Sequence, residues 1–133
     1  MARNNEAILK FLDDLRADYS FFEDYIDVPR DFDSDMNACG KVLVGQPICV
    51  ELDLDSIKDM PSSARSPTGM SIEQARCYLR AATGANRIAP APRPLVLYVH
   101  LPEGAPRTAE ERATVGKTLA CLVHDVVAVR EEP

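Results

Sequence analysis

The sequence predicts an α/β protein: an open, mostly parallel sheet with helices on both faces, in a three-layer αβα arrangement. The chain has 133 residues, of which 46% are hydrophobic and 27% charged. This length and composition fit one globular domain over residues 1–133. Segments with helical spacing alternate with apolar runs typical of strands. Because such alternation is usually joined by right-handed crossovers, it favours parallel strands covered by helices.

The amino-terminal part predicts an amphipathic helix followed by a short strand. Apolar residues recur at helical spacing over about residues 4–18, so one face of this helix is expected to dock on the core. The residues that carry this spacing are Ile8, Phe11, Leu12 and Leu15. A short apolar run at 25–28 predicts a strand that ends at Pro29, because proline cannot continue a ladder in the middle of a sheet.

The next segment predicts a helix, a strand and a long loop. An aspartate or serine among residues 31–34 can cap a helix that runs to about Val44. A strand over 48–55 begins apolar and becomes alternating, as expected for an inner strand whose far end emerges beside a cleft. Residues 56–70 show no periodicity and contain five Ser or Thr. A loop of this length predicts a binding function.

A capped helix and a second strand follow. Ser71 and Gln74 have capping-box spacing, and the helix they begin is expected to end at Gly84. A proline-rich spacer at 89–94 leads into residues 95–101, which have strong β propensity. This run predicts a buried strand. Because a single capped helix joins it to the strand near 48–54, the two strands are expected to be neighbours in the sheet.

The last predicted element is a helix. Thr108 and Glu111 repeat the capping-box spacing at its start. Apolar residues then recur at helical spacing, which predicts a face packed on the core. These residues are Val115, Leu119, Leu122, Val123 and Val126.

The charge of the chain limits its partners. Fifteen Lys and Arg against 21 Asp and Glu give a formal net charge of -6. A phosphate backbone or an anionic membrane would be repelled, so neither nucleic acid nor a membrane is an expected partner. Residues 1–66 carry 14 acids and 7 bases, and any cation-binding chemistry is therefore expected in that half.

The cysteines and the first residues point to the cytoplasm. Cys39, Cys49, Cys77 and Cys121 form no CxxC pair and lie in apolar runs, which predicts reduced thiols in the core. The start MARNNEAILK lacks the basic and apolar regions of a signal peptide. No apolar stretch approaches the ~18 residues of a membrane span. We therefore expect a cytoplasmic protein.

Two aspartates form the strongest candidate for chemistry. Asp53 and Asp55 stand two residues apart near the end of the strand predicted at 48–55, so both side chains are expected on one face. The carboxyl end of a parallel strand opens onto the usual ligand crevice. Two ionised carboxylates there need a compensating cation, and hard oxygen ligands suit Mg²⁺ or Mn²⁺. The alternative is a solvated strand end with two unrelated acids.

Glu103 and the two histidines are weaker candidates. Glu103 follows the second predicted strand, beside Gly104, which would let a ligand approach the backbone. Its carboxylate could pair with a guanidinium or formimino group, and the alternative is an acid in an ordinary turn. His100 lies in an apolar strand and His124 on a helix of core-like spacing, which favours structural roles for both.

The order of these features resembles the carboxyl-terminal half of the ureohydrolase family, which includes arginase, agmatinase and formimidoylglutamase. The resemblance covers about residues 19–127 and is closest to the bacterial arginase and formimidoylglutamase-like branch. The stretches that carry it are CVELDLDSIKDMPSSARSPTGMSIEQARCYLR and LYVHLPEGAP. It implies an arginase-like fold, of which this chain holds a part.

The resemblance also implies an activity and its residues. Asp53 and Asp55 match aspartates that bind two Mn²⁺ ions in the family, and Glu103 matches the acid that contacts the guanidino-like end of the substrate. Pro67 and Gly69 match a proline and a glycine of the family's following loop, and Ser71 matches the serine or threonine that opens the helix after it. The implied function is Mn²⁺-dependent hydrolysis of a guanidino or formimino carbon–nitrogen bond in a small molecule.

The chain departs from the family pattern in ways that affect this function. His100 and Ala105 stand where family members usually have an acid and an Asn or Ser, and Glu51 replaces a small residue. The GGxH and DxHxD segments, which supply the other metal ligands, are missing. We therefore expect a fragment that lacks the amino-terminal ligands and is inactive alone. It would act as a homo-oligomer or with the missing half.

Two other functions remain open. A Mg²⁺-dependent phosphotransfer enzyme could use the DxD, but it would need a downstream lysine and a second acid pair, and the only lysines after the motif are Lys58 and Lys117. A non-catalytic α/β module could instead bind a protein through the sheet edge or the long loop. Metal titration separates the enzymes from the module.

Overall fold

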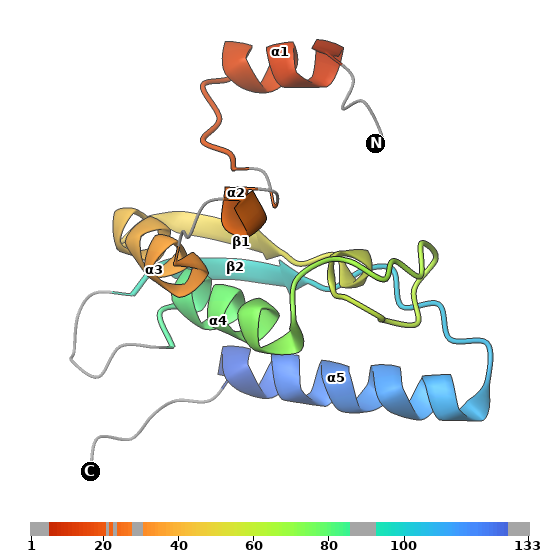
Figure 1. Cartoon of the computed structure of the whole chain (residues 1–133). Coiled ribbons are helices and arrows are strands. Elements are labelled where there is room, and N and C mark those ends of the chain that lie inside the picture. The colour runs from red at the N-terminus through yellow and green to blue at the C-terminus, as the bar shows by residue number, and fades with distance from the viewer. Residues whose placement is uncertain (1–5, 21, 23, 28–30, 86–92, 128–133) are drawn as a thin grey trace. The chain divides into compact units, whose positions relative to one another are not determined.

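A computed structural model describes residues 6–20, 22, 24–27, 31–85 and 93–127 (Figure 1). The contacts divide the chain into two compact units, residues 1–30 and 31–133. The elements in chain order are α1 (Glu6–Asp14), α2 (Asp24–Asp27), α3 (Phe32–Val42), β1 (Pro47–Glu51), the 3₁₀ helix η1 (Leu54–Ser56), α4 (Ile72–Thr83), β2 (Leu95–His100) and α5 (Ala109–Val127). The mixture of helices with an open, two-stranded parallel sheet confirms the α/β class. The predicted spacer at 89–94 lies largely outside the described residues.

The first unit holds two helices where the sequence predicts a helix and a strand. Helix α1 lies inside the predicted 4–18 segment and confirms the helix, but none of its residues is buried, so the predicted docking of its apolar face is not seen. The prediction of a strand at 25–28 is wrong, because residues 24–27 form the short helix α2. The N–H of Tyr25 donates to the carbonyl of Phe22 at 3.0 Å, so this backbone bonds locally. An apolar run this short cannot distinguish a strand from a helical turn.

The sheet of the second unit joins β1 to β2 in parallel, as predicted for neighbouring strands. Pro47 lies opposite Leu95, and Glu51 lies opposite His100. Strand β1 ends at Glu51, earlier than the predicted end at residue 55. The two strands belong to one sheet although α4 and a long loop separate them in the chain.

The caps of α3 and α4 confirm their predicted starts. The Asp31 carboxylate accepts hydrogen bonds from two backbone N–H groups in the first turn of α3. The Ser71 N–H donates to Gln74 Oε1 at 2.8 Å, and the Gln74 N–H donates to Ser71 Oγ at 3.1 Å, which completes the capping box. Helix α4 ends at Gly84, whose φ of 74° is left-handed and costs glycine little. Among the described helices, none is long and apolar enough to cross a bilayer.

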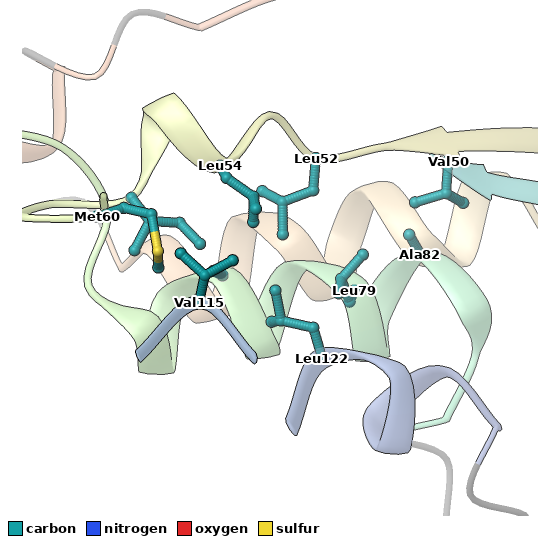
Figure 2. Close-up of a cluster of buried hydrophobic side chains, with 10 residues drawn as sticks. Val50, Leu52, Leu54, Met60, Leu79, Ala82, Val115 and Leu122 are labelled. Carbon is teal, nitrogen blue, oxygen red and sulfur yellow. The ribbon is translucent and has the colours of Figure 1, made fainter. Parts of the chain in front are cut away.

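The core of the second unit lies between the β1 segment, α4 and α5 (Figure 2). Leu54 after β1, Leu79 on α4 and Leu122 on α5 are each at most 1% exposed. Helix α4 is central, because α3, α5 and β1 all pack against it. Burying these leucines removes apolar surface from water, which is the main favourable contribution to folding.

Two further contacts fix the helices against one another. Gly40 on α3 lies so close to α4 that an added Cβ would stand 2.5 Å from the carbonyl oxygen of Ala81, so only glycine fits there. Between α4 and α5, Asp125 is 4% exposed and accepts hydrogen bonds from Arg76 Nε at 2.6 Å and Arg76 Nη2 at 3.1 Å. A buried carboxylate requires such partners.

The outer face of the sheet is exposed, although the sequence predicts that it is buried. Residues 95–101 are predicted as a buried strand, but Leu95 and Leu97 are 62% and 61% exposed, and Tyr98 is exposed as well. The prediction is wrong because high β propensity indicates residues that fit a pleated strand. It does not indicate that both faces of the strand are covered. We call Leu95, Leu97 and Tyr98 the outer apolar face.

The four cysteines are free, but they do not form part of the core as predicted. Cys39, Cys49 and Cys121 are exposed, and Cys77 is half-buried. Their apolar neighbours lie on elements with one solvent-facing side, which a run of apolar letters does not reveal. Burial raises the pKa of Cys77 to about 11, so this thiol stays protonated at neutral pH.

Candidate functional site at the carboxyl ends of the strands

Backbone pairing continues past both strands and brings the predicted site residues to one edge. The N–H of Leu54 donates to the carbonyl of Pro102 at 3.0 Å. Asp53 and Asp55 flank Leu54, and Glu103 follows Pro102. The three acids therefore lie at the carboxyl-end edge of the parallel sheet, where open α/β sheets bind ligands.

Asp53 does not stand on a strand face. Because β1 ends at Glu51, the prediction that Asp53 and Asp55 leave one face of a strand is wrong. Asp53 is instead the N-cap of the 3₁₀ helix, and its Oδ1 accepts the N–H of Asp55 at 2.8 Å. Aspartate forms such bonds with nearby backbone readily, and this preference outweighs the alternating pattern that predicted a longer strand.

Asp55 is held by the turn Ser62–Ala64. Its Oδ2 accepts the Ser63 hydroxyl at 3.0 Å, and its Oδ1 accepts the Ala64 N–H at 3.2 Å. The Ser62 hydroxyl makes the largest contribution to lowering the pKa of Asp55 below its ordinary value, against a smaller opposing effect of desolvation. Hydroxyl and amide donors thus stabilise the ionised carboxylate of Asp55. The sequence predicts that a bound cation provides this stabilisation.

Glu103 occupies an unusual backbone position. Its side chain is exposed, and its φ of 73° is left-handed, which is uncommon for a residue with a side chain. Gly104 beside it forms an isolated antiparallel bridge with Ser62. An added Cβ at Gly104 would stand 3.2 Å from Cγ1 of Val115, so the absence of a side chain here leaves room for the core.

The long loop 56–70 is fastened at both ends. The Met70 N–H donates to the Ser56 carbonyl at 2.8 Å, and the Lys58 N–H donates to the Met70 carbonyl at 2.9 Å. Gly69 has a φ of 143°, and an added Cβ would stand 2.5 Å from the Ser56 carbonyl oxygen. Ser62 is 1% exposed. The loop therefore presents its residues from a fixed backbone.

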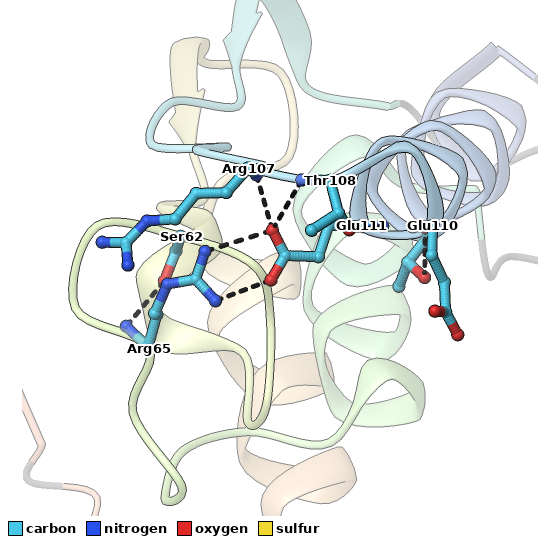
Figure 3. A network of polar contacts seen from close by, with 7 residues as sticks. Ser62, Arg65, Arg107, Thr108, Glu110 and Glu111 are labelled. Atoms are coloured by element: carbon cyan, nitrogen blue, oxygen red, sulfur yellow. Dashed lines mark hydrogen bonds and ion pairs between the residues drawn. The ribbon is translucent and has the colours of Figure 1, made fainter.

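Arg65 ties this loop to the start of α5 (Figure 3). Its Nη1 and Nη2 donate to the two carboxylate oxygens of Glu111 at 2.7 and 3.2 Å. The same carboxylate accepts the backbone N–H groups of Arg107 and Thr108. These donors, with Arg65 first, lower the pKa of Glu111 from 4.5 to about 2. A shallow pocket of about 360 Å³ adjoins this pair and is lined also by Met60 and Thr114.

The histidines are not placed in the core. His100 is exposed, with its Nδ1 3.7 Å from Oε2 of Glu51, its register partner. His124 on α5 is also exposed. In the part of the chain that the structure describes, no group of three or more His, Cys, Asp or Glu side chains converges to hold a metal ion. Asp53 and Asp55 therefore do not by themselves fit a two-manganese centre, which needs more donors.

Sequence reasoning missed the loop residues that make the contacts around this edge of the sheet. Ser62, Ser63 and Arg65 carried no signal beyond a loop rich in serine, and their partners become apparent only once the loop is folded. No protein-family model, curated protein or solved structure matches the chain. Fold and site together define an α/β protein with three acids at the carboxyl-end edge of its parallel strands.

Proposed function

We propose that this chain is the carboxyl-terminal part of an arginase-like ureohydrolase, a Mn²⁺-dependent enzyme that hydrolyses a guanidino or formimino carbon–nitrogen bond. The observation that carries the proposal is the Leu54–Pro102 backbone hydrogen bond, which extends the parallel pairing and aligns Asp53 and Asp55 with Glu103. Two carboxylates after one strand and a third acid after the neighbouring strand are what hard metal ions and a cationic substrate would require.

The roles of the three acids follow from their surroundings. Asp55 is ionised and directed by fixed donors, which suits a metal ligand. Asp53 keeps oxygen lone pairs beyond the one used by the Asp55 N–H. Glu103 is exposed on a fixed turn, which suits an acid that orients the cationic end of a small substrate.

The remaining donors belong, in this proposal, to a further chain segment. That segment would add strands at the edge of the sheet and helices over the outer apolar face, and so complete the three-layer arrangement. Parallel sheets are normally covered on both faces, and the exposed Leu95 and Leu97 are consistent with a missing layer. The chain alone is therefore expected to be inactive and to bind Mn²⁺ weakly.

The test compares the chain alone with a chain joined to an amino-terminal ureohydrolase half that supplies the histidine and aspartate ligands. With Mn²⁺ and arginine, agmatine or formimidoylglutamate, only the joined protein should turn over. In it, Asp53→Ala or Asp55→Ala should lose metal and several orders of magnitude in rate, whereas Glu103→Ala should keep metal and lose rate. Asp14→Ala on α1 is the charge-matched control and should change neither.

Two results would contradict the proposal. One is turnover by the 133-residue chain alone with stoichiometric Mn²⁺, measured by elemental analysis beside steady-state rates. The other is a joined protein whose metal content is unaffected by Asp53→Ala and Asp55→Ala. Either result would remove the assigned ligand roles.

The outer apolar face favours a second candidate, a non-catalytic module that binds a protein. Exposed large apolar residues that gather on one face are a common mark of such surfaces. In that case the stability of the chain would not change with Mn²⁺, and Leu97→Thr would abolish association while Asp55→Ala would not.

A further inference from the structure

One side of β1 has no neighbouring strand in the part of the chain that the structure describes. The Leu52 N–H, just past β1, donates to the His100 carbonyl at 3.0 Å, so this N–H faces β2. In a trans peptide the C=O and N–H point in opposite directions, so the Glu51 C=O of the same peptide faces away from β2. We call this side of Pro47–Glu51 the free edge of β1.

A tyrosine side chain already occupies the carbonyl at the end of the free edge. The hydroxyl of Tyr78 on α4 donates to the Glu51 C=O at 2.9 Å. Its ring is half-buried and packs against the core, so the hydroxyl is presented from a fixed position. Unpaired backbone groups on an edge strand attract other strands, and native proteins cover such edges. Tyr78 therefore caps the acceptor that an added strand would use.

The rest of the free edge offers few other groups. The Leu95 N–H donates to the Gln46 C=O at 2.9 Å, so the nitrogen of Pro47 faces the free edge, where it has no hydrogen to donate. Beyond β1, the Asp53 C=O accepts the Ser56 N–H at 3.0 Å. A strand added here would pair around Glu51, and its pairing would compete with the Tyr78 hydroxyl.

The acids indicate which segment would take the free edge. Asp53 and Asp55 follow β1, and Glu103 follows β2 on one side of it. Within the described ranges, no group of three or more His, Cys, Asp or Glu side chains converges to hold a metal ion. Groups at the carboxyl ends of adjacent parallel strands share one crevice. The remaining donors of a metal site are therefore expected after a strand on the other side of β1.

We propose that the Tyr78 hydroxyl caps the free edge of β1 in this chain and is exchanged for a strand of the further, ligand-bearing segment. The identity of that segment rests on the proposed function. The exchange loses one hydrogen bond to the Glu51 C=O and gains one from a backbone N–H of the incoming strand, so it costs little. Until then, the cap keeps unrelated strands from pairing at this edge.

The experiment measures amide hydrogen exchange in the chain alone and in the joined protein described above. Exchange at Leu52, whose N–H shares a peptide with the Glu51 C=O, is taken relative to the core amide of Leu79, so that a global loss of stability cancels. Tyr78→Phe keeps the ring and removes only the hydroxyl. It should speed relative exchange at Leu52 by about fivefold in the chain alone, the factor for one lost hydrogen bond. In the joined protein it should have no effect.

A second measurement needs no substitution. The Glu51 N–H lies on the same side as its C=O in an extended strand, so it faces the free edge. Its exchange should be fast in the chain alone and at least about tenfold slower in the joined protein, where a strand would pair with it. Tyr98→Phe is the matched control, because it removes a hydroxyl from the outer apolar face and should leave relative exchange at Leu52 unchanged in both proteins.

Three results would overturn the proposal. Tyr78→Phe could leave Leu52 unchanged in the chain alone, it could speed exchange equally in both proteins, or the Glu51 amide could remain fast in the joined protein. These outcomes are separate from the test of the proposed function. A slow Glu51 amide in a joined protein that binds no Mn²⁺ would remove that function and leave the edge exchange standing, whereas a fast Glu51 amide in an active joined protein would do the reverse.

Discussion

The two faces of the same small sheet differ sharply. Toward α4, Val50 is 2% exposed and packs with Leu79, whereas on the other face Leu95 and Leu97 are more than half exposed. Strand β2 alone supplies both surfaces, because Val96 packs against the core while its neighbours Leu95 and Leu97 face away from it. The difference teaches that the helix-facing side holds this unit together, while the outer apolar face contributes little to its stability.

The largest loss of stability is expected on the helix-facing side. Leu79→Ala removes a fully buried side chain from the contact between α4, α5 and β1. It should lower the free energy of unfolding by about 3 kcal/mol, from lost transfer energy and the cavity left behind. Urea unfolding followed by circular dichroism gives the value. A loss below about 1 kcal/mol would show that this core is loosely packed.

The buried ion pair between α4 and α5 is the next largest contribution. Asp125→Ala leaves Arg76 and Arg80 without their carboxylate, but both arginines keep partial contact with water. We therefore expect a loss of about 2 kcal/mol, below the value for a fully buried pair. The same urea titration measures it. Asp125→Asn should recover part of the loss, because its carbonyl oxygen can still accept a hydrogen bond.

Two helical glycines can be compared, because one lies against a neighbouring helix and the other faces open space. Gly40→Ala forces a methyl group against the Ala81 carbonyl, so α3 and α4 must separate, at a cost of about 1–2 kcal/mol. Gly116→Ala on α5 meets nothing within 4 Å and should stabilise the chain by about 0.5–1 kcal/mol through helix propensity. Thermal melts of both should shift in opposite directions. Equal shifts would contradict the close approach of the two helices.

The Arg65–Glu111 pair predicts a pH dependence. The pKa of Glu111 is lowered from 4.5 to about 2 in the folded chain, so the ionised carboxylate stabilises the fold. This stabilisation is fully present above pH 4.5 and is lost as the pH falls toward 2. Glu111→Gln keeps a capping side chain without the charge. The difference in Tm between the two proteins should be constant above about pH 5 and shrink below it.

The smallest effect on folding is expected on the outer apolar face. Leu97→Thr replaces an exposed leucine with a residue of good β propensity, and it should change the free energy of unfolding by less than about 0.5 kcal/mol. Self-association, measured by light scattering, and binding of a hydrophobic dye should both fall. Unchanged association would mean that this face does not drive contacts between chains.

Local signals explain which elements the sequence could predict. The capping box of α4 and its terminal Gly84 depend on residues a few positions apart, and the structure has both as predicted. The parallel pairing of β1 and β2 followed from the capped helix between them. The prediction of a strand at 25–28 failed because so few apolar residues show no clear periodicity and cannot exclude a helical turn.

The candidate site was predictable only in part. The edge that gathers Asp53, Asp55 and Glu103 follows from strand order, and strand order follows from the pattern of elements. The contacts around these acids do not follow from the pattern of elements. Ser62 and Arg65 meet partners that are distant in the chain, Gly104 and Glu111, and only the folded loop brings them together. A serine-rich stretch without periodicity does not indicate which serine will be buried.

The parallel pairing of β1 with β2 also has a consequence for how fast the chain folds. Pro47 can meet Leu95 only after the intervening loop and α4 have been gathered between them. Closing so long a segment costs chain entropy before the hydrogen bonds between the strands can form. Proteins with many such distant contacts fold slowly. The loop closure between Ser56 and Met70 joins residues only 14 apart and is expected to form first, with β2 joining in a later, rate-limiting step.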